Sequence, residues 1–307
     1  MFKPRVSKWL AWLLLAAGLT ITTQPIIAAA PNRAVEVVDA RGKTLRLEQP
    51  ARRLIALAPH LVENLFSAGA GDRLLAAVDY SDYPEAAKSL PRVGSYNTIN
   101  YEAILAYQPD LVLVWLSGNG PEVADQLERL GLTVYVDEPR SLDDIAASLV
   151  TLGQLAGTET EARQRATTWQ ASLEGLRNHY RDAATVTVFY QIWNNPLQTL
   201  NGSHLVSDVM QVCGGRNIFA DTLAIAPIVG TEAVLSRNPD TIIASGMGEE
   251  RPLWLDTWQG YTELTAVKHH NLFYIPADLI QRHTLRLLEG TQLMCEQLDQ
   301  ARQKKTR

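Results

Sequence analysis

A short motif occurs twice in this sequence and restricts the possible folds more than any other pattern. Tyr-Glu-Ala-Ile-Leu at 101–105 leads to Pro-Asp-Leu-Val-Leu at 109–113, and 130 residues later Thr-Glu-Ala-Val-Leu leads to Pro-Asp-Thr-Ile-Ile at 239–243. Each copy has the pattern of a helix, a Pro-Asp turn and a buried strand. This order is common in α/β proteins, but the Glu-Ala pair at the same place in both copies favours a true duplication. We therefore expect two similar lobes.

Strand-like and helix-like segments alternate around both copies of the motif. Apolar runs at 54–58, 111–115, 185–190 and 241–244 have the composition of buried strands, and stretches of helical spacing separate them. Strands that alternate with helices indicate parallel sheets covered by helices, which is an α/β fold. Before the first run, residues 35–47 have the pattern of a short hairpin.

A long helix is predicted between the two lobes. Apolar residues recur there at intervals of three and four, as on one face of a helix: Ala162, Ala166, Trp169, Leu173, Leu176 and Tyr180. Thr158 and Glu161 have the spacing of a capping box at its start. We predict an N-terminal α/β lobe at 31–157, one rigid connecting helix at 158–183 and a C-terminal α/β lobe at 184–307. The crevice between two such lobes is the expected ligand site.

Residues 1–30 have the features of a secretory signal peptide. Three cations within the first eight residues precede an apolar run at 9–21, and three alanines at 28–30 provide a cleavage site. A membrane anchor is the alternative, but a spanning helix needs about 20 apolar residues, and Gln24 and Pro25 interrupt the run. We expect cleavage near residues 28–30 and export of a soluble chain.

Export makes the two cysteines, Cys213 and Cys295, informative. An even number of cysteines in an oxidising compartment favours a disulfide, and closing a loop of this length would stabilise the fold by about 4 kcal/mol. Two buried free thiols are the alternative. A metal site is less favoured, because neither cysteine has a second Cys or a His at ligand spacing.

Charge and motif content argue against nucleic-acid binding and against catalysis. The net charge is −5, from 28 Lys and Arg against 33 Asp and Glu, whereas phosphate binding needs a basic face. The sequence has no Gly-x-Ser-x-Gly elbow, no phosphate-binding loop, no Gly-x-Gly-x-x-Gly motif and no His-Glu-x-x-His pair. His60 reads as a polar residue at a helix start rather than a metal ligand. We predict no enzyme activity, no catalytic residue and no metal site.

Aromatic residues gather where the predicted strands end: Tyr80, Tyr83, Tyr96, Trp115 and Trp193. Ligands of open α/β sheets bind at the carboxyl ends of strands, and aromatic rings there can stack on a flat ligand. Each ring alone could equally anchor a loop, and Trp169 on the helical stripe is expected in the core. Together the strand-end aromatics favour a large, planar or bulky ligand.

Several stretches carry a resemblance to a known family: Val-Asp-Ala-Arg-Gly at 38–42, the runs at 53–59 and 67–72, Tyr-Ser-Asp-Tyr-Pro at 80–84, the Pro-Asp strand ending in Trp115, Val-Cys-Gly-Gly at 212–215 with Asn-Ile-Phe at 217–219, and Cys295 in the last helix. They resemble the helical-backbone (class III) periplasmic binding proteins, which serve ABC importers of iron-siderophores, haem and cobalamin. The resemblance covers almost all of the mature chain and is greatest to the cobalamin (vitamin B12) carriers. It implies a periplasmic protein that captures cobalamin or a related corrinoid between two lobes and delivers it to an inner-membrane ABC transporter.

The resemblance also implies individual roles. In the first lobe, Tyr80, Tyr96 and Trp115 would contact the corrinoid, and Tyr96 stands where the cobalamin carriers have a tryptophan. In the second lobe, Asp278 and Arg282 would hydrogen-bond the amide groups of the ligand. A tryptophan expected near Ala226 is missing.

Two further expectations follow from the resemblance. Trp193 would replace an aromatic residue expected near position 192. Cobalamin would be cargo, and the protein would carry no cofactor of its own.

Glu102 and Glu232 match the two exposed carboxylates with which this family docks onto arginines of its permease. The repeated motif places them at equivalent points of the two lobes. The alternative is that each is an ordinary glutamate in the first turn of a helix, where the helix dipole favours negative charge.

Three other functions stay open at this point. The same architecture would accommodate haem or a ferric siderophore, with Tyr80, Tyr96 or His60 as an iron ligand. An exported metal-dependent enzyme could use the same cleft. A docking or assembly protein would retain only a vestigial crevice.

Overall fold

The computed structural model describes residues 1–2, 34–95, 97–246 and 250–305. The predicted cleavage site at 28–30 and the apolar run at 9–21 lie outside the described residues. Within the described part of the chain, no helix is both long enough and apolar enough to cross a membrane.

The first lobe is built on a parallel sheet of four strands in the order β4-β3-β7-β8. Its strands are β3 (Leu54–Ala56), β4 (Leu74–Ala77), β7 (Leu111–Trp115) and β8 (Val134–Asp137). Residues of each strand enter two separate apolar clusters, one on each face of the sheet, and in β3 and β7 the two clusters take alternate residues. Because both faces are buried, these strands read in the sequence as continuous apolar runs.

Helices cover both faces of this sheet. One apolar cluster contains residues of α1 (Pro59–Ser67) and α5 (Leu142–Ala156), and the other contains residues of α2 (Tyr101–Ala106) and α4 (Pro121–Arg129). Four smaller elements of this lobe are β5 (Gly94–Ser95), β6 (Thr98–Ile99), α3 (Leu116–Asn119), and the 3-10 helices η1 (Gly71–Arg73) and η2 (Glu85–Ser89). The predicted hairpin is present as the antiparallel pair β1 (Val35–Val38) and β2 (Thr44–Leu47).

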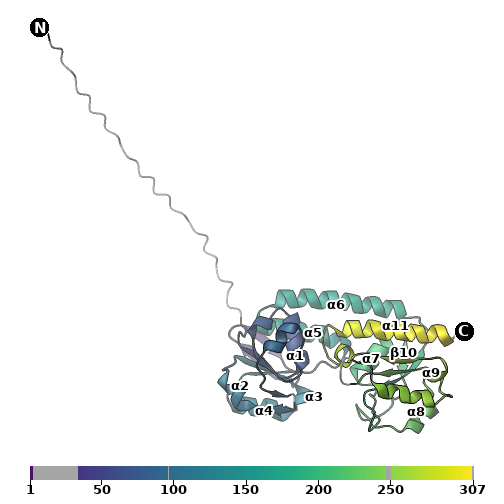
Figure 1. The fold of residues 1–307 in the computed structure, drawn as a ribbon. Coiled ribbons are helices and arrows are strands. Elements are labelled where there is room, and N and C mark those ends of the chain that lie inside the picture. The colour runs from purple at the N-terminus through teal and green to yellow at the C-terminus, as the bar shows by residue number, and fades with distance from the viewer. Residues whose placement is uncertain (3–33, 96, 247–249, 306–307) are drawn as a thin grey trace. The chain divides into compact units, whose positions relative to one another are not determined.

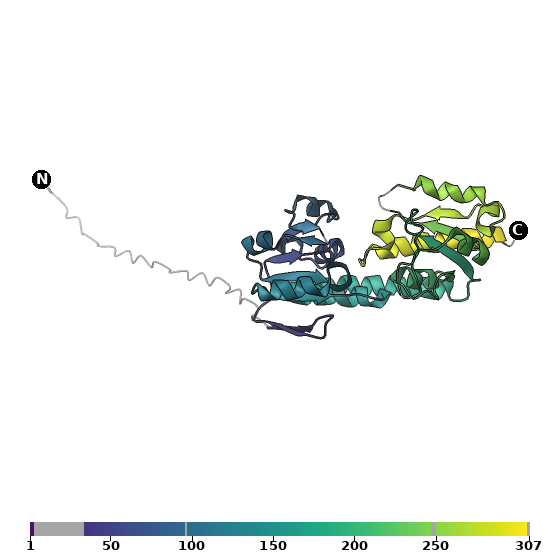
Figure 2. The same ribbon diagram turned by 90° about the horizontal axis from the view of Figure 1, so that it is seen from below.

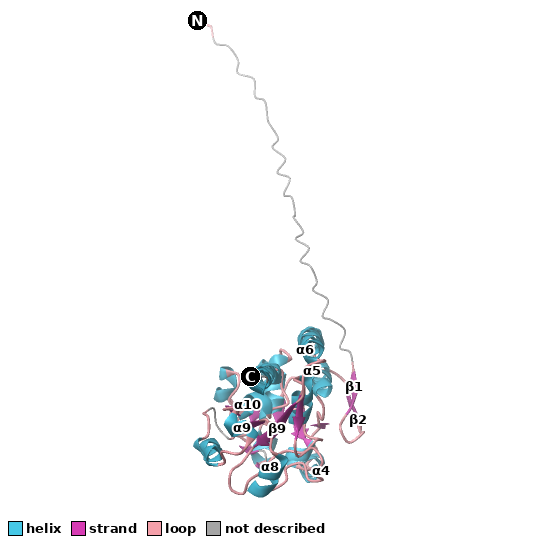
Figure 3. Cartoon of the chain, turned by 90° about the vertical axis from the view of Figure 1, so that its right-hand side faces the viewer, coloured by secondary structure: helices cyan, strands magenta, loops and turns pink. Residues whose placement is uncertain are grey.

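The second lobe repeats this plan. Its parallel sheet has the order β10-β9-β11-β12, formed by β9 (Val186–Gln191), β10 (Gly215–Asn217), β11 (Thr241–Ala244) and β12 (Leu272–Tyr274). Its helices are α7 (Leu205–Val212), α8 (Thr231–Arg237), η3 (Leu253–Gly260), α9 (Thr265–Lys268), α10 (Ala277–Ile280) and α11 (Leu287–Lys305). Figure 3 shows the strands of the parallel sheets between α5 and α6 on one side and α4 and α8 on the other, with β1 and β2 off to the side. The predicted α/β class with parallel sheets is confirmed.

The long predicted helix is present as α6 (Glu159–Tyr180). Its buried residues include Trp169, whose Nε1 donates a hydrogen bond to the carbonyl of Leu285 at 2.9 Å. Helix α6 packs against α5 and also against α7 and α11 (Figures 1 and 2). One apolar cluster therefore runs from α5 through α6 into the second lobe. The lobe boundaries given above stay a prediction.

The predicted capping box at the start of α6 is wrong. The side chain of Thr158 makes no capping hydrogen bond and its Oγ1 is buried without a partner, while Glu161 pairs with Arg165 at 2.8 Å. The reason lies in the preceding helix, which ends at Gly157 in the left-handed conformation. The backbone N–H of Thr158 donates to the carbonyl of Gly153 at 2.7 Å, as in a Schellman motif. That N–H is therefore not free to donate a hydrogen bond to the carboxylate of Glu161.

The repeated Pro-Asp turns have the same task in both lobes. Asp110 Oδ2 accepts hydrogen bonds from the backbone N–H groups of Arg52 and Arg53, at 2.8 and 3.0 Å, just before β3. Asp240 Oδ2 accepts from the backbone N–H and the hydroxyl of Thr187 in β9, both at 2.9 Å. Each carboxylate thus fixes the start of the strand beside its own, which supports a duplication.

The predicted disulfide is present. Cys213 and Cys295 are bonded with their Cα atoms 4.7 Å apart. Both are buried and join the end of α7 to α11. The alternative of two free thiols is therefore wrong.

Candidate functional site

The predicted ligand residues follow the carboxyl ends of strands in both sheets. Tyr80 comes three residues after β4 and Trp115 is the last residue of β7, while Trp193 follows β9. Asp278 and Arg282 follow β12, in and just after α10. This is the edge at which parallel α/β sheets bind ligands. Tyr96 lies outside the described residues.

Arg282 connects the two lobes. Its Nη1 donates to Asp82 Oδ1 at 3.1 Å, and its Nη2 donates to the carbonyl of Tyr80 at 3.2 Å. The same Nη2 lies 3.0 Å from Asp278 Oδ1. The structure thus brings together Tyr80, Asp278 and Arg282, three of the residues predicted from sequence, and adds Asp82 to them.

Tyr80 is presented to solvent by an unusual backbone conformation. Its φ is 63°, in the left-handed region that bulky residues avoid, and its side chain is 73% exposed. Such a conformation costs on the order of 1–3 kcal/mol, and residues that adopt it cluster at functional sites. An exposed aromatic ring on a constrained backbone suits contact with a ligand.

Trp115 lies in a group of three rings drawn from both lobes. The centroid of its ring is 5.0 Å from that of His60, at the start of α1, and 6.1 Å from that of His283, next to Arg282. The two histidine rings are 5.5 Å apart. Gly118 leaves room for the indole, because a Cβ there would lie 1.8 Å from Cε3 of Trp115. Trp115 and Arg282 are therefore neighbours through His283.

Trp193 makes a local contact instead. Its indole Nε1 donates to the carbonyl of Asn195 at 3.0 Å, and the ring is 39% exposed. Among the described contacts, none links Trp193 to the residues around Arg282. The role of Trp193 in ligand binding therefore stays a prediction.

A second arginine, which sequence reasoning missed, also crosses between the lobes. Arg286 binds Glu63 of α1 through two hydrogen bonds of 2.9 and 2.7 Å, and the Glu63 side chain is only 2% exposed. The guanidinium carbon lies 3.7 Å from the centroid of the Tyr83 ring. Burial opposes the charge of Arg286, but the hydrogen bond and charge of Glu63 raise its pKa above the usual value. No local sequence pattern pointed to this pair, because its two members are 223 positions apart in the chain.

Three histidines near the contacts of Arg282 and Arg286 between the lobes, which we call the junction, are held neutral. Burial lowers the pKa of His283 to about 4, and burial together with the charge of His283 lowers the pKa of His204 to about 4. Burial, followed by the charges of His283 and Arg282, lowers the pKa of His60 well below its usual value. Among the described residues, no group of three or more His, Cys, Asp or Glu could hold a metal ion.

We predict that His204→Asn reduces the acid sensitivity of the fold. The pKa of His204 is about 4 in the folded protein and 6.5 in the unfolded chain. The unfolded chain therefore binds the proton more readily, so the contribution of His204 to the free energy of unfolding is complete above pH 6.5 and is lost as the pH falls towards 4. At pH 4.5 the loss amounts to about 2.5 kcal/mol. Asparagine keeps an acceptor for the N–H of Val206, which His204 Nδ1 binds at 3.2 Å. Urea unfolding at pH 7.5 and 4.5 should show a smaller difference for the variant.

The control is His270→Asn, since His270 is exposed and its φ of 52° suits asparagine. Burial raises the pKa of Asp137 to about 6 although Ser148 donates a hydrogen bond to it, so this carboxyl adds stability as the pH falls and partly offsets the histidines. The contribution of Asp137 is the same in the parent, in His204→Asn and in His270→Asn, so it cancels when their pH dependences are compared. Equal pH dependence of His204→Asn and the parent would contradict the prediction.

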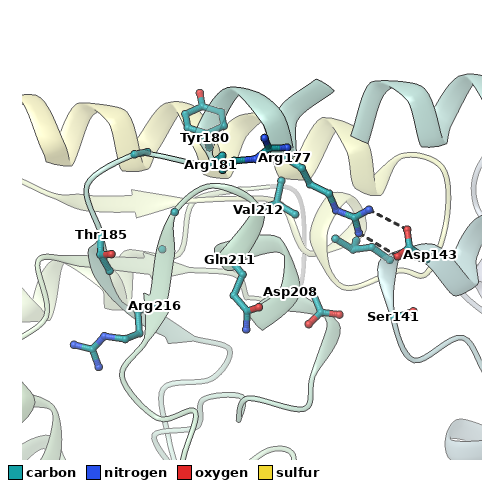
Figure 4. Close-up of a pocket in the computed structure, with 14 residues that line it drawn as sticks. Ser141, Asp143, Arg177, Tyr180, Arg181, Thr185, Asp208, Gln211, Val212 and Arg216 are labelled. Atoms are coloured by element: carbon teal, nitrogen blue, oxygen red, sulfur yellow. Dashed lines mark hydrogen bonds and ion pairs between the residues drawn. The ribbon is translucent and has the colours of Figure 1, made fainter. Parts of the chain in front are cut away.

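A hollow of about 640 Å³ elsewhere in the structure is polar (Figure 4). It lies beside the end of α6, where Arg177 pairs with Asp143 at 3.1 Å, and it is also lined by Arg181, Asp208 and Arg216. None of the predicted ligand residues lines it. Its charged walls do not match a flat, largely apolar ligand, so we take the group around Arg282 as the candidate site.

Comparisons with known proteins agree with this architecture. The family model described as periplasmic binding protein matches residues 54–279. The vitamin B12-binding protein of Vibrio cholerae is 36% identical over 249 residues, which are 81% of this chain and 90% of that protein. The vitamin B12-binding protein of Yersinia pestis is 36% identical over 250 residues, 81% of this chain and 87% of that one.

Solved structures give the same picture. The crystal structure of the periplasmic vitamin B12 binding protein of Vibrio cholerae superposes with a TM-score of 0.75 at 36% identity, covering 82% of this chain and 98% of that one. A periplasmic heme-binding protein from Roseiflexus has a TM-score of 0.73 at 21% identity, covering 82% of this chain and 99% of that one. At that identity the second likeness shows the fold alone.

Proposed function

Since the chain belongs to the periplasmic binding protein family, we propose that it captures cobalamin or a related corrinoid at the strand-end residues and delivers it to an inner-membrane ABC transporter. The observation that carries the proposal is that residues of the two lobes meet here: Tyr80 contacts Arg282, which also pairs with Asp278, and Trp115 packs near His283, the neighbour of Arg282 in the chain. The relatives named vitamin B12-binding proteins, at 36% identity, support the choice of ligand.

The chemistry of these side chains suits a corrinoid. Trp115, Tyr80 and Tyr96 would cover its flat apolar surface, while Arg282 donates to amide oxygens and Asp278 accepts from amide N–H groups at its edge. Trp193 would add an aromatic contact from the second lobe. The ligand is cargo: no bond is made or broken, and the cobalt arrives and leaves with the corrinoid.

The proposal places the mature chain in the periplasm, after cleavage near residues 28–30. Calorimetric titration of the mature protein with cyanocobalamin tests it. We expect saturable binding of one ligand per chain. Absence of binding up to high micromolar concentration would overturn the cobalamin assignment, and binding of haemin or a ferric siderophore in its place would identify the alternative cargo.

Glu102 and Glu232 are proposed to dock the protein onto the permease. Each is the second residue of its helix, α2 or α8, and each is exposed. The duplication places them at equivalent positions of the two lobes, so that together they can address a permease made of two similar halves. Such charges govern orientation and association rate more than ligand affinity.

We predict that the double variant Glu102→Arg, Glu232→Arg associates with the permease roughly tenfold more slowly or worse, because like charges would now meet. Its dissociation constant for cyanocobalamin should stay unchanged. Surface plasmon resonance against the transporter in nanodiscs measures the first quantity.

The matched control is Glu122→Arg, which reverses an exposed glutamate at the second position of α4. Normal association of the double variant would remove the docking role. Association that is strong and indifferent to cobalamin would favour a docking protein with a vestigial ligand site.

A further inference from the structure

Most N–H groups of the Arg282 guanidinium already face protein partners in this structure. Asp82 occupies Nη1, and Asp278 and the carbonyl of Tyr80 share Nη2. The Arg282 side chain is only 15% exposed. Three of its five N–H groups face these partners, and little of the side chain is open to solvent. A ligand therefore reaches the guanidinium most directly by replacing one of its present partners.

Asp82 is the partner that can be given up most easily. Its side chain is 47% exposed, so water can solvate the carboxylate once the arginine leaves, and exposed ion pairs hold weakly. The neighbouring pair of Arg286 and Glu63 is buried and bidentate, and breaking it would leave a charge without water or partner. The pair of Arg286 and Glu63 is therefore the more firmly held of the two, and we call the pair of Arg282 and Asp82 the exchangeable pair.

The exchangeable pair also determines the local charge. Asp82 and Asp278 both lie within 3.1 Å of the single guanidinium of Arg282, which leaves this corner of the site with a surplus of one negative charge. A neutral amide can accept a hydrogen bond from Arg282 there without electrostatic penalty. A carboxylate on the ligand would meet the two aspartates as like charges.

We propose that Asp82 is a specificity-determining residue, which holds Arg282 in the ligand-free protein and selects ligands whose edge carries neutral amides over those that carry carboxylates. The inference rests on the proposed function and assigns a role to a residue that does not itself bind the cargo. It predicts discrimination between a corrinoid with amide side chains and the same ring with free carboxylates.

The test compares Asp82→Asn with the parent protein in calorimetric titrations with cyanocobalamin and with cobyrinic acid, the corrinoid whose side chains end in carboxylates. The parent should bind cyanocobalamin more tightly. In the variant, the dissociation constant for cobyrinic acid divided by that for cyanocobalamin should fall roughly tenfold or more. The fall should come mainly from tighter binding of cobyrinic acid, and this gain in affinity should shrink as salt is added.

Asp79→Asn is the control, since it removes one exposed negative charge from the same loop without a side-chain contact to Arg282. An unchanged ratio in Asp82→Asn, or an equal fall in Asp79→Asn, would overturn the role of Asp82. Failure of the parent protein to bind cyanocobalamin would instead overturn the proposed function, so the two outcomes are distinguishable. Thermal unfolding of each variant confirms that the comparison is made on folded protein.

Discussion

Replacing Trp115 with alanine is expected to weaken cobalamin binding by about 3 kcal/mol, on the order of a hundredfold in the dissociation constant. Tryptophan buries a large area against a flat ligand, and truncating such an anchor removes both the stacking and the exclusion of water. Trp115 is also held in place before the ligand arrives. Its backbone N–H donates to Asn119 Oδ1 at 2.7 Å, and its ring packs against His60.

Calorimetry with cyanocobalamin measures this loss, and Trp115→Phe is the matched variant. Phenylalanine keeps a ring at the end of β7, so we expect it to retain most of the affinity. Circular dichroism establishes that both variants are folded. A dissociation constant that Trp115→Ala leaves unchanged would refute the stacking role.

Replacing Glu63 with alanine is expected to destabilise the protein by about 3–5 kcal/mol. The change leaves the guanidinium of Arg286 at the junction with the Tyr83 ring but without its carboxylate, and that guanidinium is only 15% exposed. Urea unfolding at neutral pH measures the difference in the free energy of unfolding.

Two further variants separate the ion pair from simple packing. The double variant Glu63→Met, Arg286→Met should recover much of the loss, because two apolar side chains need no partner charge. Glu85→Gln breaks an exposed pair with Lys88 and should change stability little. A small effect of Glu63→Ala would mean that water reaches Arg286 and that the pair does not hold the lobes together.

The repeated Pro-Asp motif and the stripe on the long helix were predictable because they depend on local rules. A carboxylate in the turn between a helix and the following strand meets the start of the neighbouring strand in both lobes, at Asp110 and at Asp240. Trp169 faces the core because residues three and four apart share one side of a helix. The capping box failed for the same kind of reason, since the turn at Gly157 had already used the N–H of Thr158.

The candidate site could be foreseen only in part. That aromatic residues follow the carboxyl ends of strands is readable from the alternation of strands and helices, and it led to Tyr80 and Trp115. Asp278 and Arg282 came from the family resemblance alone. The partners of these residues were not readable. Asp82 and Arg282 are 200 positions apart in the chain.

By itself, the sequence determined the α/β class, the two lobes, the long helix and the pairing of its only two cysteines, because periodicity, duplication and residue chemistry act over short stretches or by elimination. The tertiary structure alone decided that Arg286 meets Glu63, that Arg282 meets Asp82, and that His60, Trp115 and His283 share one junction. Contacts between lobes depend on how two separate sheets pack along α6, and no local preference of the chain encodes that packing.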